Sequence, residues 1–276
     1  MSNQPPIETG QASSAEQPFN FECIRYEVKN ALALITINRP EKHNAISLQT
    51  LSELQQAVDL AAVNERVRVI GITGAGGKAF ASGSDLNEVM NRDLKKALEP
   101  IVQGLALQLE NLPKATIAAI DGICMGGGLE VALGCDMRIC TSRSRFGTPE
   151  GKLGIIPGGG ATVRLPRIVG RGWAMEMMLM GEPIGAGQAL QMGLVTCVLE
   201  ADQLMAELER RATHLATFAP FVPQFMKLML HKGMESSKEA ALTMEKMGQG
   251  ALLQTEDKNE GIDAFLTKRK PEFHGR

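Results

Sequence analysis

The fold of this chain is decided by the stretch Ala115-Thr-Ile-Ala-Ala-Ile-Asp-Gly-Ile-Cys-Met-Gly-Gly-Gly-Leu-Glu-Val-Ala-Leu-Gly134. Its first apolar run, Ala115 to Ile120, predicts a buried strand that ends at the turn Asp121-Gly122. Three glycines, residues 126 to 128, then precede a second apolar run that Gly134 could close. The simplest prediction is a strand, a glycine turn and a short buried helix.

Gly127 and Glu130 are the residues of this stretch that could carry chemistry. The first N–H groups of a helix have no partners within the helix, and they favour negative charge. A glycine there allows close approach to the backbone. Glu130 lies in an apolar run, where a carboxylate is costly to bury unless it is neutralised, hydrogen-bonded or used. Taken alone, the pattern favours a tight turn and a half-exposed surface glutamate.

A second carboxylate, Glu150, follows beside Pro149 in a predicted loop. Two carboxylates that are brought together can have their pKa values pushed apart, which leaves one acid and one base at neutral pH. Glu130 and Glu150 are therefore candidates for such a pair.

Composition limits the classes of function. A chain of 276 residues fits one large domain, or one domain with a small appendage, and 44% hydrophobic residues suffice for a sizeable core. The net charge of −2 gives no reason to expect nucleic acid or an anionic membrane as a partner. No apolar run approaches the roughly 20 residues that span a bilayer.

Residues 1–20 are predicted to be a disordered tail, because they are rich in Gln, Pro, Ser and Ala and contain no Lys or Arg. That composition matches neither a secretory signal nor a transit peptide. The five cysteines are an odd number at irregular spacings, mostly in apolar segments. They predict buried free thiols in a reducing cytoplasm rather than disulfides or a zinc site. With four scattered histidines, no metal site is expected.

Apolar runs in the first half of the chain predict alternating strands and helices. The predicted elements are a hairpin of strands 21–29 and 31–38 around Asn30, a helix from the N-cap Ser47 to Val63, a strand 67–73, mixed helix 86–112 and a strand 137–141. Helices that connect apolar strands favour right-handed βαβ units and mostly parallel pairing.

The second half changes to helix. Short helices 158–169, 171–180 and 186–192 and a brief strand 194–198 are followed by four helices at about 201–217, 220–232, 237–254 and 256–268. The change near residue 200 predicts an appended helical module, residues 201–276. Ser236 and Glu239 match a capping box at the third of these helices. Trp173, Met177 and Met178 are predicted to be core residues rather than a cofactor site.

One glycine-rich segment has a competing interpretation. Gly74-x-Gly76-x-x-Ala79 after a strand fits a loose form of the dinucleotide fingerprint. No clean helix begins at residues 80–84, and no strand ending in an acidic residue follows at the required distance. A P-loop does not fit either, because Ala79 rather than Ser or Thr follows Lys78. Dinucleotide binding therefore remains a minor alternative.

Several motifs occur in a characteristic order. They are Asn38-Arg39-Pro40 with Asn44-Ala45, the segment Ala79-Phe-Ala-Ser-Gly-Ser-Asp85, Gly126-Gly-Gly128 with Glu130, and Phe146-Gly-x-Pro-Glu150 through Gly154-x-x-Pro-Gly-Gly159. Together they resemble the enoyl-CoA hydratase/isomerase (crotonase) superfamily over residues 21–273. The resemblance implies an α/β fold, with a spiral of repeated ββα units in residues 21–200. It also implies a helical C-terminal region, residues 201–276, that builds trimers, often stacked into hexamers.

The resemblance also implies a chemistry, the stabilisation of a thioester enolate. The backbone N–H groups at the positions of Ser84 and Gly127 would form the oxyanion hole for an acyl-CoA carbonyl. Many relatives carry Ala at the position of Ser84. Glu130 would orient and deprotonate the water that attacks C3, and Glu150 would exchange a proton with C2. Glutamate at both positions favours an enoyl-CoA hydratase. A Δ3,Δ2-enoyl-CoA isomerase or another acyl-CoA lyase stays open, because some isomerases also have two acids.

Substrate contacts follow by motif position. The implied substrate-binding residues are Lys42, Ala81, Ser82, Ser84, Asp85, Leu86, Gly127 and Lys268. Lys268 would meet the ribose phosphate of CoA, often from a neighbouring subunit, although residues 268–270 also read as a solvated helix end. Lys42 and His43 are weaker candidates for this contact. The acyl pocket would be walled by residues 86–105 and the C-terminal helices.

The resemblance implies no metal or redox cofactor, since CoA is part of the substrate, and a cytoplasmic homotrimer or dimer of trimers. A non-catalytic acyl-CoA or RNA-binding relative is a remote alternative. The two retained glutamates and the lack of a basic patch argue against it.

Overall fold

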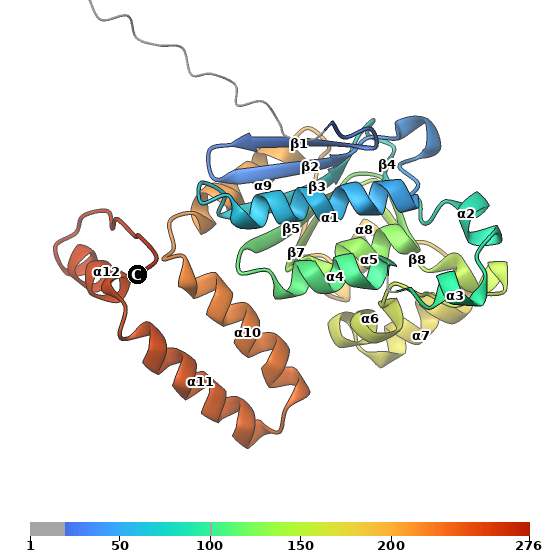
Figure 1. Ribbon diagram of the computed structural model, residues 1–276. Coiled ribbons are helices and arrows are strands. Elements are labelled where there is room, and N and C mark those ends of the chain that lie inside the picture. The colour runs from blue at the N-terminus through green and yellow to red at the C-terminus, as the bar shows by residue number, and fades with distance from the viewer. Residues whose placement is uncertain (1–19, 100) are drawn as a thin grey trace, which may run out of the picture.

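The computed structural model describes residues 20–99 and 101–276 (Figure 1). The predicted disordered tail, residues 1–20, lies outside the described residues except for its last residue. The described chain forms a mixed α/β body, from which the last helices extend.

A six-stranded sheet runs through the described part of the chain. Its order is β1 (Ile24–Lys29), β2 (Leu32–Ile37), β3 (Val69–Gly74), β5 (Ala115–Ile120), β7 (Met137–Thr141) and β10 (Cys197–Leu199). β1 and β2 pair antiparallel, and the chain reverses between them at Asn30, whose φ is 54°. All other neighbours pair parallel. The predicted hairpin and the predicted parallel pairing are confirmed.

A second, smaller sheet shows that the strands occur in repeated pairs along the chain. Its order is β4 (Ala79–Ala81), β6 (Ile123–Met125), β8 (Arg145–Gly147) and β9 (Ile184–Gly185), with the first three parallel. β3–β4, β5–β6 and β7–β8 each place one strand in each sheet before the chain turns into helix. The α/β class and the repeated ββα units are therefore confirmed. The sequence did not predict the short strands of this sheet, because three residues are too few to show a hydrophobic period.

β5 shows why its sequence is a continuous apolar run. Every residue of this strand is buried. Ala118 and Ile120 belong to the core beneath α1 (Leu48–Val63), α4 (Ile101–Asn111) and α5 (Gly127–Gly134), whereas Ile117 belongs to the core beneath α9 (Leu204–Leu215). A strand that is covered on both faces needs apolar residues at every position.

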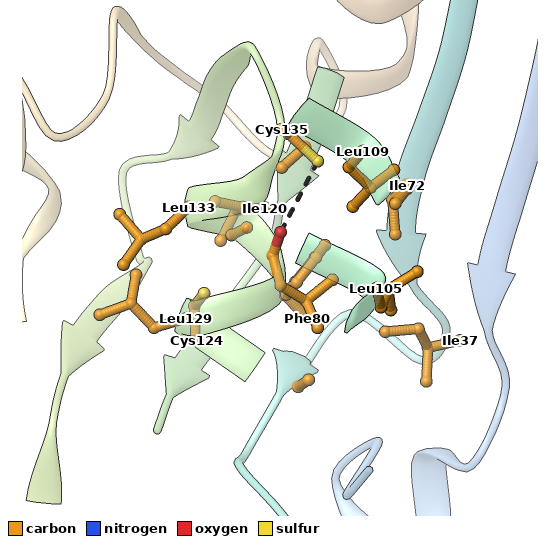
Figure 2. Packing of buried hydrophobic residues seen from close by; sticks show 14 of the residues in the cluster. Ile37, Ile72, Phe80, Leu105, Leu109, Ile120, Cys124, Leu129, Leu133 and Cys135 are labelled. Carbon is orange, nitrogen blue, oxygen red and sulfur yellow. Dashed lines mark hydrogen bonds between the residues drawn. The ribbon is translucent and has the colours of Figure 1, made fainter. Parts of the chain in front are cut away.

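Figure 2 shows side chains from the larger of these two cores, to which α4, α5 and strands of the large sheet contribute. Its labelled side chains include Leu105 and Leu109 of α4, Leu129 and Leu133 of α5, and Ile72 and Ile120 of the strands. This packing fixes the start of α5 relative to the strand ends.

The other helices are mostly where the sequence predicted them. The mixed region 86–112 resolves into α2 (Leu86–Met90), α3 (Leu94–Ala97) and α4. A 3-10 turn, η1 (Pro40–Lys42), precedes α1. The later helical elements are the 3-10 turn η2 (Pro149–Leu153), α6 (Ala161–Val169), α7 (Arg171–Met180), α8 (Ala186–Gln191), α10 (Phe221–Glu235), α11 (Lys238–Leu252) and α12 (Glu256–Leu266). Ser47 caps α1 as predicted, because its Oγ accepts from Thr50 N at 3.1 Å.

Two sequence predictions were wrong in detail. The N-cap of α11 is Ser237, whose Oγ accepts from Ala240 N at 3.2 Å, whereas Ser236 Oγ donates to Lys232 O in the last turn of α10. The capping box was therefore placed one residue too early. Trp173 is 46% exposed and is not a core residue, whereas Met177 is buried as predicted. Trp173 occupies the outer face of α7, which apolar composition alone does not distinguish from the inner face.

The predicted helical module, residues 201–276, does not lie entirely outside the α/β body. α9 packs on the large sheet, and α10 to α12 extend beyond it (Figure 1). α10 is tied back by the buried Lys227, whose Nζ lies 2.9 Å from both Asp136 Oδ2 and Leu109 O. Several apolar residues of α10 and α11 remain exposed, namely Met226, Leu228, Leu230, Met234, Leu242 and Met247.

The cysteines are all free thiols; Cys23, Cys124, Cys135 and Cys140 are buried, and Cys197 is partly exposed. Among the helices of the described residues, none is both long enough and apolar enough to cross a membrane. Within residues 20–99 and 101–276, no cluster of three or more His, Cys, Asp or Glu could hold a metal ion.

Candidate active site

The turn between β6 and α5 is the centre of the candidate site. Gly126 has a φ of 47° and donates its N–H to Gly147 O at 3.0 Å, and α5 begins at the next residue. Gly128 lets the helix rest directly on β4, since a Cβ there would lie only 2.6 Å from the Cβ of Ala81. The start of α5 is thus held at the ends of the short strands.

Ser84 and Gly127 bring two backbone N–H groups close together. Ile46 N donates to Gly83 O, and Asp85 N donates to Ile46 O, both at 2.8 Å, which fixes the backbone around Ser84. A Cβ built on Gly127 would lie 3.4 Å from Ser84 N. Within the described chain, neither the Ser84 nor the Gly127 N–H donates to a backbone or side-chain acceptor. Two such groups can together bind an oxyanion.

The motif around Asn38 to Ala45 supports this geometry. The side chain of Asn44 is buried and donates to Ala79 O at 2.7 Å and Ala75 O at 3.0 Å, at the two ends of the β3–β4 turn. Arg39 contacts Asp85 at 3.3 Å, directly after Ser84. These contacts give Asn44 and Arg39 a structural role that the sequence analysis did not identify.

Glu130 is a buried carboxylate with two backbone donors. It lies in the first turn of α5 and is 3% exposed. Its Oε1 accepts from Gly159 N at 2.7 Å and from Ala161 N at 3.1 Å, both at the start of α6. Burial raises the pKa of Glu130 above its ordinary value, and the backbone donors act in the opposite direction. The hydrogen bonds favour the ionised form of this residue.

Glu150 is also buried, but its hydrogen bonding differs from that of Glu130. It lies in η2, is 9% exposed, and its buried Oε2 has no hydrogen-bond partner in the described part of the chain. Burial raises the pKa of Glu150, a hydrogen bond from its own backbone N–H acts in the opposite direction, and the negative charge of Glu130 raises this pKa further. A Cβ on Gly126 would lie 3.0 Å from Glu150 Oε1, so the carboxyl group faces the start of α5. This environment favours the protonated form of Glu150.

A cavity of about 1210 Å³ joins these groups. It is lined by Glu130, Glu150, Gly127 and Ser84, and the predicted substrate-binding residues Lys42, Ser82, Asp85 and Leu86 line it as well. Ala81 does not line it, because this residue is buried in β4 beneath Gly128. Lys268 follows α12, on the opposite side of Figure 1 from α2 and α3, so the fold of one chain does not bring it to the cavity.

The cavity wall includes the predicted segment 86–105 and also residues after Glu150 that were not predicted. The segment 86–105 contributes Asn87, Val89, Arg92, Glu99, Ile101 and Val102, and η2 with the loop that follows it contributes Lys152, Leu153, Ile155 and Ile156. The described C-terminal helices of the same chain do not line it. Ile155 and Ile156 could have been predicted from the sequence, because exposed apolar residues in a glycine-rich loop can mark a ligand-binding site.

The alternative of a dinucleotide site is not supported by the local structure. β3 ends at Gly74 and a short strand, β4, begins at Ala79. The dinucleotide fingerprint requires a helix to begin at this point, so that its N-terminus meets the pyrophosphate. Here the chain forms a second strand instead.

The comparisons with known proteins agree with the geometry. A model of the family described as enoyl-CoA hydratase/isomerase matches residues 27–276. The 2,3-dehydroadipyl-CoA hydratase of Escherichia coli K12 is 40% identical over 88% of this chain and 95% of its own. The crotonyl-CoA hydratase of Syntrophomonas wolfei is 36% identical over 92% and 98%. The crystal structure of an enoyl-CoA hydratase from Bacillus anthracis superposes with a TM-score of 0.89 at 34% identity, over 92% of this chain and 100% of the other.

Proposed function

The chain belongs to the enoyl-CoA hydratase/isomerase family, and on that basis we propose that it is an enoyl-CoA hydratase that adds water reversibly to a 2-enoyl-CoA. The observation that carries the proposal is the contrast between the two carboxyl groups. Glu130 accepts two hydrogen bonds from the backbone, whereas Glu150 Oε2 accepts none within the described chain, and both residues line the cavity that contains Ser84 and Gly127.

The proposed reaction uses the pair as one base and one acid. The thioester carbonyl oxygen binds the N–H groups of Ser84 and Gly127, so that negative charge can develop on it as the C3–O bond forms. Ionised Glu130 takes a proton from the attacking water, and protonated Glu150 gives a proton to C2 of the enolate. One water is added, one carboxyl group has gained a proton and the other has lost one, and exchange with solvent restores the starting state.

The remaining parts of the proposal follow from this reaction and from the shape of the chain. Water supplies both added groups, so the proposed reaction needs no redox cofactor, and in this proposal the two N–H groups rather than a metal ion stabilise the carbonyl oxygen. We propose a homotrimer or a dimer of trimers, in which Lys268 of a neighbouring subunit meets the CoA phosphate. The extended α10 and α11 with their exposed apolar residues support such an assembly. The free thiols support a cytoplasmic location.

The test of the proposed function is the loss of ultraviolet absorbance of crotonyl-CoA after the protein is added. The product is identified by chromatography. Formation of 3-hydroxybutyryl-CoA supports hydration. A 3-enoyl-CoA is assayed in parallel, and its conversion to the 2-enoyl isomer without hydration would replace the hydratase by the isomerase. If crotonyl-CoA is not consumed, 2-enoyl-CoA thioesters with longer and with carboxylated acyl chains are tested, and no hydration of any of them would refute the proposal.

The rate of hydration should depend on pH in both directions. Because the pKa of Glu130 lies above its ordinary value of 4.5, kcat should fall as the pH drops through that pKa and the base becomes protonated. The pKa of Glu150 is raised as well, and kcat should fall again as the pH rises through it and the acid is lost. The measurement is kcat against pH with saturating substrate.

Glu130→Gln provides the internal check of this pH profile. The substitution removes the negative charge that raises the pKa of Glu150. The alkaline limb of the remaining activity should therefore move to lower pH. An alkaline limb that stays in place would show that the two carboxyl groups do not interact.

A further inference from the structure

The two N–H groups that donate hydrogen bonds to Glu130 belong to a glycine-rich turn, and the sequence of this turn does not fix its backbone conformation. Gly159 and Ala161 lie in the sequence Pro157-Gly-Gly-Gly-Ala161, at the start of α6. Glycine has more accessible backbone conformations than any other residue. Three successive glycines therefore need an external contact if two N–H groups are to stay within hydrogen-bond distance of one carboxylate oxygen.

Arg164 supplies that contact. Its Nη1 donates to Gly159 O at 3.1 Å, and its Nε and Nη2 donate to the two carboxylate oxygens of Glu110 at 2.7 and 2.8 Å. Glu110 lies near the end of α4, which packs into the core. The side chains of Arg164 and Glu110 are only 13% and 21% exposed. A shielded bidentate pair of this kind has a strict geometry, so it anchors the turn to α4.

The glycine at position 160 makes room for this arrangement. Gly160 has a φ of 110°, and a Cβ on it would collide with Arg164 Nη1. The guanidinium group therefore packs directly against the backbone of the turn whose N–H groups bind Glu130.

We infer that Arg164 is a positioning residue for Glu130, which fixes the Gly159–Ala161 turn between Glu110 and the Glu130 carboxylate. The inference rests on the proposed function, in which Glu130 takes the proton from water. Arg164 is not among the described residues that line the cavity, so it acts through the turn rather than on the substrate. The charge of Arg164 also lowers the pKa of Glu130 and so opposes the effect of burial.

Arg164→Met should lower kcat for hydration by roughly 10- to 100-fold, because a catalytic group displaced by about 1 Å can cost that much. KM should change less than kcat, since every side chain that lines the cavity is retained and only the backbone near Gly159 is displaced. The acidic limb of the kcat–pH profile should move to higher pH, because burial of Glu130 is then less opposed. Glu110→Gln, which leaves Arg164 in place but weakens its anchor, should shift both quantities in the same direction and by less.

Two further variants make the test specific. Arg164→Lys keeps the positive charge but cannot hold Glu110 and Gly159 together, so kcat should stay low. Full recovery with Lys would show that only charge matters and would overturn the positioning role. Arg167→Met removes an exposed arginine one turn later on the same helix, which bonds only to Val163 O among the described residues, and should leave kcat and the pH profile unchanged.

A readout that does not need turnover separates this inference from the proposed function. The protonated carboxyl band of Glu130 is assigned by infrared difference spectroscopy as the band lost in Glu130→Gln, and it is followed against pH in the wild type, Arg164→Met and Glu110→Gln. An upward shift of the Glu130 pKa in both variants supports the inference even if no enoyl-CoA is hydrated. An unchanged pKa with unchanged kcat in a folded Glu110→Gln or Arg164→Met protein would overturn it and leave the hydratase proposal intact.

Discussion

Glu150→Gln is expected to lower kcat for hydration of a 2-enoyl-CoA by roughly 10²- to 10⁴-fold, the usual contribution of a positioned general acid. Gln has nearly the same shape as protonated Glu, but it has no proton that it can give to C2. The fold should be preserved, since Glu150 Oε2 has no hydrogen-bond partner to lose in the described structure. The measurement is initial rate with saturating substrate, together with thermal unfolding of the variant.

Deuterium exchange assigns the role of Glu150 more closely. In D2O, exchange at C2 of the 3-hydroxyacyl-CoA product requires a group that removes and returns the C2 proton. That exchange should vanish in Glu150→Gln and persist at a reduced rate in Glu130→Gln, which still has the C2 acid and the two N–H groups. The reverse result would exchange the roles of the two residues. Glu176→Gln, at an exposed glutamate of α7 outside the cavity lining, is the matched control and should behave as the wild type.

Gly127→Ala is expected to lower kcat by roughly 10²- to 10³-fold, as much as the loss of one oxyanion-hole donor, because the added methyl group obstructs the N–H groups. The added Cβ would lie 3.4 Å from Ser84 N and 2.8 Å from Ser84 Oγ, so it would obstruct the space beside the two N–H groups. Helical backbone accepts alanine more readily than glycine, so the loss should come from the site rather than from the helix. The measurement is kcat and kcat/KM for hydration of crotonyl-CoA.

Two further variants serve as controls for Gly127→Ala. In the double variant Ser84→Ala with Gly127→Ala, the contact with the hydroxyl is gone but the obstruction of the N–H groups remains. Activity should therefore stay low. Recovery of wild-type activity would attribute the loss to the clash with the serine hydroxyl and contradict obstruction of the N–H groups as its cause. Gly172→Ala adds a Cβ to α7 where nothing lies within 4 Å, and it should leave kcat unchanged.

Much of the fold could be predicted because its causes are local. The cap at Ser47, the helical spacing of α1 and the apolar run of β5 are all determined by neighbours within a few residues. The strands of the smaller sheet could not be found this way. β4, β6 and β8 have three residues each, and their hydrogen bonds go to strands far along the chain. The misplaced capping box at Ser236 shows the same limit on a scale of one residue.

For the candidate site, the order of the motifs was sufficient to identify the family, and it named Glu130, Glu150, Ser84 and Gly127. No pattern in the sequence could show how the two glutamates differ in hydrogen bonding. That difference arises because the α6 turn meets Glu130, whereas Glu150 Oε2 is buried without a described partner. The role of Arg164 was likewise invisible, since Glu110 lies on a different helix.

The sequence by itself thus determined the α/β class, the longer elements and the residue types of the site, because these depend on local spacing and on chemistry that each residue carries with it. Only the tertiary structure decided the environments of Glu130 and Glu150, the approach of Ser84 to Gly127, and the anchor from Arg164 to Glu110. The physical reason is that burial, hydrogen bonding and charge act over a few ångströms in space. The groups concerned come together only when α4, α5 and α6 pack at the ends of the strands.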